Sequence, residues 1–600
     1  MCGITAYCGN DFALPFLMQG LSKLEYRGYD SAGVTTLESG QLLTVKCKGR
    51  LKNLEDELTK YEIKGNIGIG HTRWATHGIP SNLNSHPHTN EDQTISLVHN
   101  GIIENYRELK EELIKKGYQF QSETDSEVVV QLLDLYDAGN IFEATKKVLK
   151  KIEGSYALCI VSTKEPDKIV VAKKDSPLII GKVNNAYVAA SDIPALLEYT
   201  KDVYFLNDLE MAIMEKEKIS FFTHDGQSIE KKLVTIPYDL EAAQKDGYDT
   251  FMLKEIYEQP HVINETLRGR INHQEIVLDE LKEIDFSKFN KIYFVACGTA
   301  YHACLCGAQV LEKAIKIPVT TTPASEFRYS DPLIDEYTLA IFVSQSGETA
   351  DTLAALRLAK QKSATTIAIA NVLGSTISRD AQYVLYTCAG PEIAVASTKA
   401  YTTQLVLLFL FAYYVAQQLG KEVDHALIQQ LSHIPEYVHN ILKDHQVFEN
   451  YAKMLENLHD AYFIGRRLDY ASVLEGALKL KEVSYVHADA YVAGELKHGP
   501  IALIEAGSVV IAVATQPHIA AKTISNIQET IARGAKVILF TTHGEKVKNV
   551  ENTYYLPDVA PTLQSILVAI PLQLIAYYTA GIKGCDVDKP RNLAKSVTVE

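Results

Sequence analysis

The chain has 600 residues, of which 46% are hydrophobic, 22% charged and 9% aromatic. This composition is typical of a globular protein and excludes a disordered or fibrous chain. The 59 basic and 74 acidic residues give a net charge of −15, which argues against a nucleic-acid scaffold and against a polybasic membrane contact. At roughly 100 to 200 residues per domain, we expect about three to five domains.

The cysteines and the chain start indicate the compartment. Nine cysteines lie scattered at positions 2, 8, 47, 159, 297, 304, 306, 388 and 585 without a Cys-x-x-Cys pair. They predict neither a disulfide framework nor a zinc site, and we expect most to be small buried residues. The start, MCGITAYCGN, is unlike a signal peptide, and the longest apolar run, 405–416, is too short to span a bilayer of about 30 Å. We therefore expect a cytoplasmic protein with no membrane or nucleic-acid partner.

The segment 1–240 reads as a strand-rich α+β domain. Helices are predicted over 103–116 and 126–137. Short apolar strands with Gly and Asn between them are predicted at 66–71, 94–99, 155–161 and 167–173. The polar segment 238–250 has little apolar material and is predicted to be an interdomain linker, so we place the first domain at 1–240 and a linker with lead-in helices at 241–285.

After the linker, continuous apolar strands alternate with amphipathic helices, which predicts parallel sheets covered on both faces. This half also repeats weakly. Tyr293-Phe294 matches Tyr462-Phe463, and Glu326 matches Glu495 at the same sequence offset. Val343 matches Val513 at an offset that is one residue longer. We expect two doubly wound α/β lobes, at 286–440 and 441–600, provided that the strand order repeats as well.

Cys2 is a candidate nucleophile. Removal of the initiator Met would leave its thiol beside its own α-amine, whose pKa of about 7.7 to 8.0 suits it to accept the thiol proton. The alternative is a chance cysteine at an unimportant chain end.

Two motifs at strand ends, HTRWATHG (71–78) and HNGIIEN (99–105), add binding groups. Arg73 suits a carboxylate, and Asn100 with Gly101 suits a developing oxyanion. Each has an alternative: Asn-Gly is a strong hairpin signal, and Asp125 could belong to a capping box, Thr124-x-x-Glu127, that begins a helix.

Together, MCGI, EYRGYDSAG (25–33), HTRWATHG, VHNGIIEN and SETDSE (122–127) resemble the class II glutamine amidotransferases, which are amino-terminal-nucleophile hydrolases with αββα layers. The resemblance implies that Cys2 is nucleophile and base, that Asn100 and Gly101 form the oxyanion hole, and that Arg73 and Asp125 hold the two charged groups of glutamine. Trp74 is a candidate gate between two active sites, with a packing role as the alternative.

The run SQSGETADT (344–352) joins an apolar strand to a helix. Its hydroxyls and Gly347 crowd a helix start, where free N–H groups favour an anion such as a phosphate. A plain Ser/Thr cap is the alternative. A nucleotide is disfavoured because no GxxxxGK[ST] or GxGxxG occurs here.

Further along, Glu475, Lys479 and Glu482 share one helical face, and His498 follows in AGELKHGP. Carboxylate and imidazole groups can move protons between a sugar carbon and its ring oxygen. The alternative is a solvated salt-bridge stripe.

SQSGETADT, VASTKA (395–400), EGALKLKE, GELKHGP and the tail KPRNLAKSVTVE resemble the paired sugar isomerase domains of the glutamine:fructose-6-phosphate aminotransferase family, and the likeness covers the whole chain. It implies ammonia transfer from L-glutamine to fructose 6-phosphate at the start of amino-sugar synthesis, a homodimer, and no metal or other cofactor. The implied catalytic roles are proton transfer by Glu482, ring opening by His498 and imine formation by Lys595. The implied sugar-binding residues are Thr299, Ser344, Gln345, Ser346, Thr349, Ser397 and Lys479. The chain has Ala300 where the family commonly has a serine, so that contact is in doubt.

Two other classes stay open at this point. A different class II amidotransferase would share the first domain, whether it acts on another sugar phosphate or on a pyrophosphate or adenylate substrate. A non-catalytic sugar-phosphate sensor would keep SQSGET but has no use for Cys2, Glu482 and Lys595 together.

Overall fold

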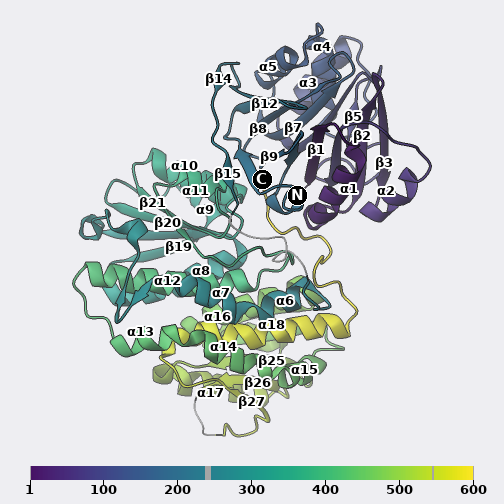
Figure 1. Cartoon of the computed structure of the whole chain (residues 1–600). Coiled ribbons are helices and arrows are strands. Elements are labelled where there is room, and N and C mark those ends of the chain that lie inside the picture. Colours follow the sequence, from purple (N-terminus) through teal and green to yellow (C-terminus); the bar gives the residue numbers. More distant parts are fainter. Residues whose placement is uncertain (1, 237–244, 543–545, 599–600) are drawn as a thin grey trace. The chain divides into compact units, whose positions relative to one another are not determined.

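The computed structural model describes residues 2–236, 245–542 and 546–598 (Figure 1). The chain divides into two compact units: Met1–Ala243 with Ala594–Glu600, and Gln244–Leu593. Part of the predicted linker, residues 237–244, lies outside the described residues.

Two facing sheets form the first unit. In spatial order, the eight-stranded sheet contains β15 (Val234–Thr235), β11 (Asp202–Phe205), β9 (Ile179–Val183), β10 (Ala186–Ala190), β1 (Gly3–Gly9), β4 (Ile67–Arg73), β2 (Ser31–Glu38) and β3 (Gln41–Lys48). The seven-stranded sheet contains β14 (Ser228–Ile229), β13 (Ile219–Thr223), β12 (Glu210–Glu215), β8 (Lys168–Lys174), β7 (Gly154–Ser162), β6 (Ile95–Ile103) and β5 (His88–Thr89). All four predicted strands are confirmed.

Helices cover the outer face of each sheet. They are α1 (Ala13–Leu24) and α2 (Leu51–Leu58) on the first sheet, and α3 (Tyr106–Lys115), α4 (Glu127–Tyr136) and α5 (Ile141–Leu149) on the second. One apolar core, with Ile4, Ile69, Val98 and Ala157, joins strands of both sheets. A second core lies between the seven-stranded sheet and α3–α5. The unit therefore has the predicted αββα layers, because its central strands are apolar on both faces.

The second unit contains two lobes with all-parallel sheets, which we name lobe 1 and lobe 2. Lobe 1 has the order β19 (Val319–Pro323), β18 (Lys291–Ala296), β20 (Thr338–Ser344), β21 (Thr365–Ala370) and β22 (Tyr383–Tyr386). Lobe 2 has the order β24 (His487–Val492), β23 (Asp460–Gly465), β25 (Val509–Ala514), β26 (Lys536–Thr541) and β27 (Asn552–Tyr555). Because each strand has its counterpart at the same place in the other sheet, the predicted duplication is confirmed.

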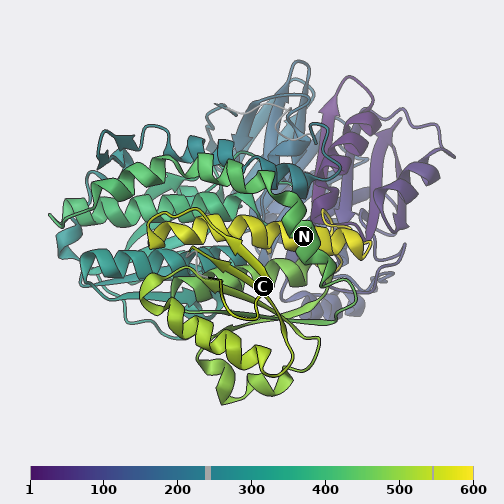
Figure 2. The same ribbon diagram turned by 90° about the horizontal axis from the view of Figure 1, so that it is seen from below.

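The remaining elements of this unit are mostly helices. They are α6 (Phe251–Tyr257), α7 (Gln259–Leu267), the hairpin β16 (Ile271–Asn272) and β17 (Glu275–Ile276), α8 (Gly298–Ile315), α9 (Ala324–Tyr329), α10 (Ala350–Gln361), α11 (Thr376–Asp380), α12 (Lys399–Gln418), α13 (His425–Ser432), α14 (Ile434–Lys443), α15 (His445–Lys453), α16 (Leu468–Ser484), α17 (Pro517–Ile531) and α18 (Gln564–Ile582). In the view of Figure 2, α18 (yellow) runs among the other helices of this unit. It packs on α16, as α12 packs on α8.

Two apolar helices are longer than the longest uninterrupted apolar run of the sequence. Among the described residues, the segments 399–418 and 561–582 are long and apolar enough to cross a membrane. Their hydropathy windows are 94% and 78% buried, so they are core helices here. The cysteines are less buried than expected: only Cys8, Cys159, Cys304 and Cys306 are fully buried among the nine, all of which are described, because several others lie near strand ends or in loops.

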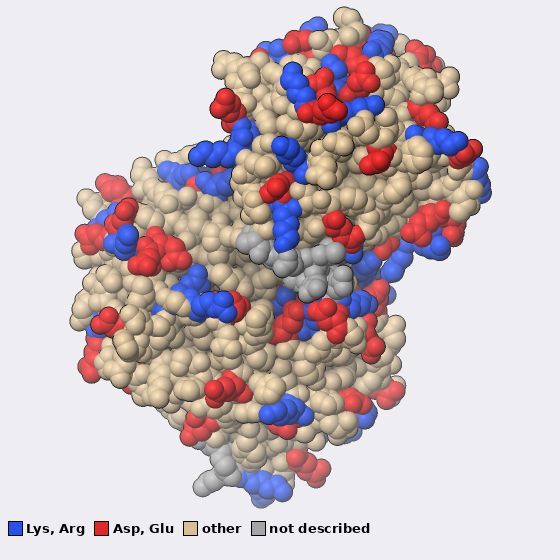
Figure 3. Space-filling model, in the orientation of Figure 1, with Lys and Arg blue, Asp and Glu red and all other residues tan. Residues whose placement is uncertain are grey.

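Charged side chains do not separate by sign on the face shown in Figure 3, where described Lys and Arg residues are interspersed with Asp and Glu. The described residues of that face therefore form no broad patch of positive charge that would attract a polyanion.

Candidate active sites

Strand pairing positions Cys2 in the first unit. β1 runs antiparallel to β4 with Gly3 opposite Thr72, so Cys2 lies beside the end of β4. The Trp74 backbone N–H donates to the Cys2 sulfur at 3.2 Å, and the thiol lies 3.5 Å from the Trp74 carbonyl oxygen. The Trp74 ring packs edge-on against Tyr29, with centroids 5.5 Å apart. The thiol is thus held at the end of a fully paired strand.

Asn100 and Gly101 both lie inside β6, so the hairpin alternative was wrong. The Asn100 side-chain amide donates to the Cys2 carbonyl oxygen at 3.0 Å. Gly101 has φ of +133°, and a Cβ there would lie 2.0 Å from the Ser155 carbonyl oxygen, which only glycine avoids. The strand therefore presents an amide donor and an obligatory glycine next to Cys2.

His71 was missed from the sequence, although it stands in the quoted motif HTRWATHG. Its Nε2 lies 3.1 Å from both the His99 carbonyl oxygen and Asn100 Oδ1. Both partners are acceptors, so Nε2 carries the proton and orients the Asn100 amide. Burial lowers the pKa of His71 to about 3, which keeps the ring neutral.

Arg73 is buried at 3% exposure. Its Nη2 donates to the carbonyl oxygens of His77 and Gly78, while Nη1 is buried without a hydrogen-bond partner in the described structure. Asp125 accepts the Ile103 backbone N–H at 2.7 Å and lies 3.9 Å from His77 Nδ1. His77 thus links a cation and an anion that share no direct contact in the described structure.

The capping-box alternative for Asp125 was wrong. Helix α4 has Ser126 as its N-cap, without a side-chain cap. Glu127 reaches back to the backbone N–H groups of Gln121 and Ser122 instead. The Asp125 carboxylate therefore has no part in capping this helix.

Burial also governs the charges around the thiol. Burial raises the pKa of Cys2, and the Trp74 N–H and the Arg73 cation partly offset that rise. Asp30, from the motif EYRGYDSAG, was not singled out from the sequence. It accepts the Ala75 backbone N–H, and burial raises its pKa against the effect of Arg73.

In lobe 1, the loop after β20 forms a turn closed by its own hydroxyls. Ser344 Oγ lies 3.2 Å from Thr349 Oγ1 and accepts the Gly347 N–H at 3.0 Å, and Ser346 Oγ accepts the Glu348 N–H at 3.2 Å. Thr349 is the N-cap of α10 but forms no side-chain cap bond. The plain-cap alternative is therefore wrong, because the hydroxyls shape the loop rather than cap the helix.

Gly347 and Gln345 belong to this loop, and Ser397 lies in a separate segment just before α12. Gly347 has φ of +68°, and a Cβ there would lie 2.2 Å from Ser375 Oγ. The Gln345 carbonyl oxygen accepts the Asn371 N–H at 3.2 Å. Ser397 donates to Glu392, a residue missed from the sequence, at 2.7 Å.

Helix α16 brings three of its charged residues to the start of α8. Lys479 Nζ lies 3.3 Å from Glu475 Oε1, 2.5 Å from Glu482 Oε2 and 3.0 Å from Thr299 Oγ1. Thr299 in turn donates to Glu475 at 3.0 Å. His302, also missed from the sequence, donates from Nδ1 to Glu475 at 2.8 Å.

Burial distinguishes this array from a surface stripe. The side chains of Lys479 and Glu475 are 1% and 3% exposed, and that of Glu482 is 19% exposed. The solvated-stripe alternative was therefore wrong. Burial by itself lowers the pKa of Lys479, but the two carboxylates outweigh it and hold that pKa above its ordinary value.

Within the second unit, His498 is not brought to this array. His498 ends a short 3-10 helix (Glu495–His498) in lobe 2, where its side chain is exposed. Lys595 belongs to the tail that groups with the first unit. Ala300, the departure from the common family pattern, is buried in α8 beside Thr299.

Comparisons with known proteins identify the domains in both halves of the chain. A glutamine amidotransferase domain model matches residues 71–198, and an SIS domain model matches residues 285–414 and 454–583. Glutamine–fructose-6-phosphate aminotransferase (isomerizing) of Clostridium tetani is 54% identical over 608 residues and that of Clostridium acetobutylicum 52% over 609, each covering 100% of both chains. The C-terminal domain of the glucosamine-fructose-6-phosphate aminotransferase of Francisella tularensis covers 58% of this chain and 100% of its own, with 41% identity and a TM-score of 0.54.

A glutamine amidotransferase domain followed by paired sugar isomerase lobes defines a glutamine-dependent enzyme that aminates a sugar phosphate. The chain belongs to the family of the glutamine–fructose-6-phosphate aminotransferases (isomerizing). It hydrolyses L-glutamine and transfers the ammonia to fructose 6-phosphate, with ketose-to-aldose isomerisation, to give glucosamine 6-phosphate and glutamate.

Proposed function

We propose that Cys2, once Met1 is removed, attacks the side-chain amide of glutamine and that its own α-amine accepts the thiol proton. The developing oxyanion would be met by Asn100 and Gly101. The observations in support are the Asn100 amide 3.0 Å from the Cys2 carbonyl oxygen and its orientation by His71. A donor fixed before the reaction stabilises charge without reorganisation.

The charged ends of glutamine would bind Arg73 and Asp125, with Trp74 closing over the site. Arg73 Nη1 is buried and unpaired in the described structure. A buried guanidinium nitrogen without an acceptor is costly, and a substrate carboxylate would satisfy it.

For the sugar, the proposal places the phosphate at Ser344, Gln345, Ser346 and Thr349, with Ser397 near the ring. The start of α10 is not capped by the Thr349 side chain, so its N–H groups remain suited to an anion. The positive φ of Gly347 lets the loop turn tightly around such a group.

Glu482 would carry the proton between C1 and C2 of the sugar. The observation that supports this assignment is the array that Glu482 forms with Lys479, Thr299 and Glu475. Within this described array, Glu482 is the acid that is partly exposed, so it is the member a bound sugar can reach, whereas Lys479 and Glu475 are buried behind it. His498 would open the ring, and Lys595 would form an imine with the open ketose.

The limits of the parts are also proposed: a glutaminase domain at 1–240, a linker with lead-in helices at 241–285, and lobes at 286–440 and 441–600. A cytoplasmic homodimer is proposed from the family likeness.

The test is to incubate the full chain with glutamine and fructose 6-phosphate and to measure glutamate and glucosamine 6-phosphate separately. Glu482→Gln should lose amino-sugar synthesis and retain glutamate release. Loss of both activities in a folded Glu482→Gln protein, or retention of both, would contradict the assignment. Sedimentation of the purified chain tests the dimer.

A further inference from the structure

The internal duplication relates helix α8 of lobe 1 to helix α16 of lobe 2. Gly298 and Arg467 stand at the two helix starts with φ of +55° and +56°, and Lys316 and Tyr485 end the helices with φ of +61° and +59°. Both pairs are separated by the same offset that relates Tyr293 to Tyr462. The sequence offset found from the strands therefore continues through these helices.

The two helices pack together. The start of α8 contacts α16 at Lys479, and Arg467 at the start of α16 lines a pocket with residues from the end of α8. At the start of α8, Thr299 meets Glu475 and Lys479 of α16, which forms the proposed sugar site. The duplication predicts a second position of the same kind at the start of α16, facing the far half of α8.

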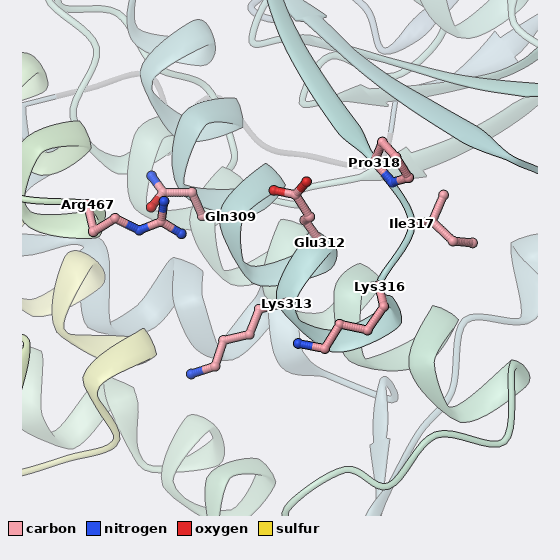
Figure 4. A pocket seen from close by; sticks show the side chains of 7 residues that line it. All are labelled: Gln309, Glu312, Lys313, Lys316, Ile317, Pro318 and Arg467. Atoms are coloured by element: carbon pink, nitrogen blue, oxygen red, sulfur yellow. The ribbon is translucent and has the colours of Figure 1, made fainter. Parts of the chain in front are cut away.

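A pocket lies at that second position. It has a cavity volume of about 410 Å³, within the usual range for small-molecule sites. Figure 4 shows that its side chains come from the end of α8 and from Arg467. The residues that line it are Gln309, Glu312, Lys313, Lys316, Ile317, Pro318 and Arg467.

The chemistry of this pocket differs from that of the proposed sugar site. By the common offset, Lys313 of α8 is the counterpart of Glu482 of α16, so the proton carrier is replaced by a cation. Three cations, Lys313, Lys316 and Arg467, line the pocket together with one carboxylate, Glu312. Within the described chain, none of the three cations forms an ion pair with a carboxylate.

The phosphate loop of lobe 1 also has a counterpart in lobe 2, and that counterpart is closed. Asp469 accepts the Thr515 N–H at 2.9 Å and the Thr515 hydroxyl at 2.5 Å, at the start of α17. Asp469 is buried, and its carboxylate occupies the position that suits an anion at that helix start. An external anion would have to compete with the Asp469 carboxylate at this loop.

Arg467 is held in a conformation that disfavours any side chain. Its φ of +56° and ψ of −121° lie outside the regions that L-residues prefer, whereas lobe 1 has glycine at the equivalent place. A strained non-glycine residue is retained where its side chain has a use, and this side chain supplies a cation to the pocket.

We propose that the pocket of Lys313, Lys316 and Arg467 is a second, non-catalytic site that binds a small phosphate-bearing anion. Binding would rest on charge-assisted hydrogen bonds to the phosphate. Lys313 stands at the position that corresponds to Glu482, and it lacks a carboxylate. No proton transfer is therefore expected in this pocket. Free phosphate and a phosphorylated sugar share this chemistry, and the experiment separates them.

The test is calorimetric titration of the full chain, at low ionic strength, with inorganic phosphate in one arm and glucosamine 6-phosphate in the other. The parent is expected to bind two phosphates per chain, and Lys313→Glu/Lys316→Glu one, with amino-sugar synthesis unchanged. Tighter binding of glucosamine 6-phosphate than of phosphate at the lost site would identify the sugar ester as the ligand, and equal binding would identify the phosphate group alone. Lys421→Glu, an exposed lysine of the same unit, is the matched control and should still bind two.

Arg467→Gly separates binding from folding. Glycine adopts this φ without strain, so the melting temperature should not fall, while the second phosphate should bind about tenfold more weakly. Two-phosphate binding in both the double-lysine variant and Arg467→Gly would overturn the proposal. So would a single binding event in the parent.

Discussion

Lys479 Nζ lies 2.5 Å from Glu482 Oε2, three residues along the same helix, and the lysine side chain is 1% exposed. The second carboxylate, Glu475, lies on the other side of the ammonium at 3.3 Å. The buried Lys479 ammonium is thus paired with two carboxylates. Of these two, Glu482 is the more exposed and is the one that a ligand can reach.

Glu482→Gln should remove proton transfer but keep the shape of the site. General acid–base groups typically contribute about 10²- to 10⁴-fold to the rate, so isomerisation of fructose 6-phosphate should fall by that range. Glutamate release should be unchanged, since Cys2 belongs to the other unit. A fall of less than about tenfold in isomerisation would move the proton carrier to another residue.

Cys2→Ala should abolish glutamine hydrolysis and leave the isomerase reaction intact. Among the described residues, Cys2 provides the only thiol at the end of β4. The Trp74 backbone N–H donates to its sulfur at 3.2 Å. Glutamate release and fructose 6-phosphate isomerisation are measured on the same preparation. Parental glutamate release in this variant would exclude Cys2 as nucleophile.

Arg73→Lys keeps the charge but loses the planar fork, so the effect should appear mainly in KM for glutamine. A loss of about 1.5 to 3 kcal/mol in kcat/KM is expected, the value of one charge-assisted contact. The buried Nη1, which has no partner in the described structure, is the group at stake. An unchanged KM would place the substrate carboxylate elsewhere.

Lys595→Arg keeps the charge but cannot form an imine. It should lose amino-sugar synthesis and retain basal glutaminase activity. Borohydride with fructose 6-phosphate should add one sugar phosphate to the parent and none to the variant, as read by mass spectrometry. Sugar attachment to Lys595→Arg would point to Lys479, the next candidate.

The buried imidazole of His71 predicts acid sensitivity of the first unit. Its folded pKa of about 3 lies below the unfolded value of 6.5, so protons bind preferentially to the unfolded chain. Stability is then lost as the pH falls below 6.5, by about 1.4 kcal/mol per pH unit, or about 2 kcal/mol by pH 5.

The measurement is the unfolding free energy of the first unit between pH 7 and 5, in the parent and in His71→Gln. The variant keeps a side-chain N–H for Asn100 but cannot titrate, so its stability should depend less steeply on pH. Equal slopes in the two proteins would show that His71 contributes nothing to the acid sensitivity.

The sequence by itself determined the strand and helix pattern, the duplication and the residue types of both sites. Strands of Val, Ile, Leu and Ala repeat in the same order, and local apolar periodicity is sufficient to predict them. Motif spacing was also enough to single out Cys2, Arg73, Asn100 and Glu482, because their chemistry is unusual at strand and helix ends.

Only the tertiary structure decided which alternatives hold. The Asn100-Gly101 pair became strand rather than hairpin because pairing with β7 outweighs local turn preference, and the stripe on α16 became a buried array because α8 packs over it. His71, His302 and the pocket at Arg467 depend on contacts between segments far apart in the chain or on two packed helices. Such contacts leave no periodic signal in the sequence, since burial and partner choice are set by packing across the fold.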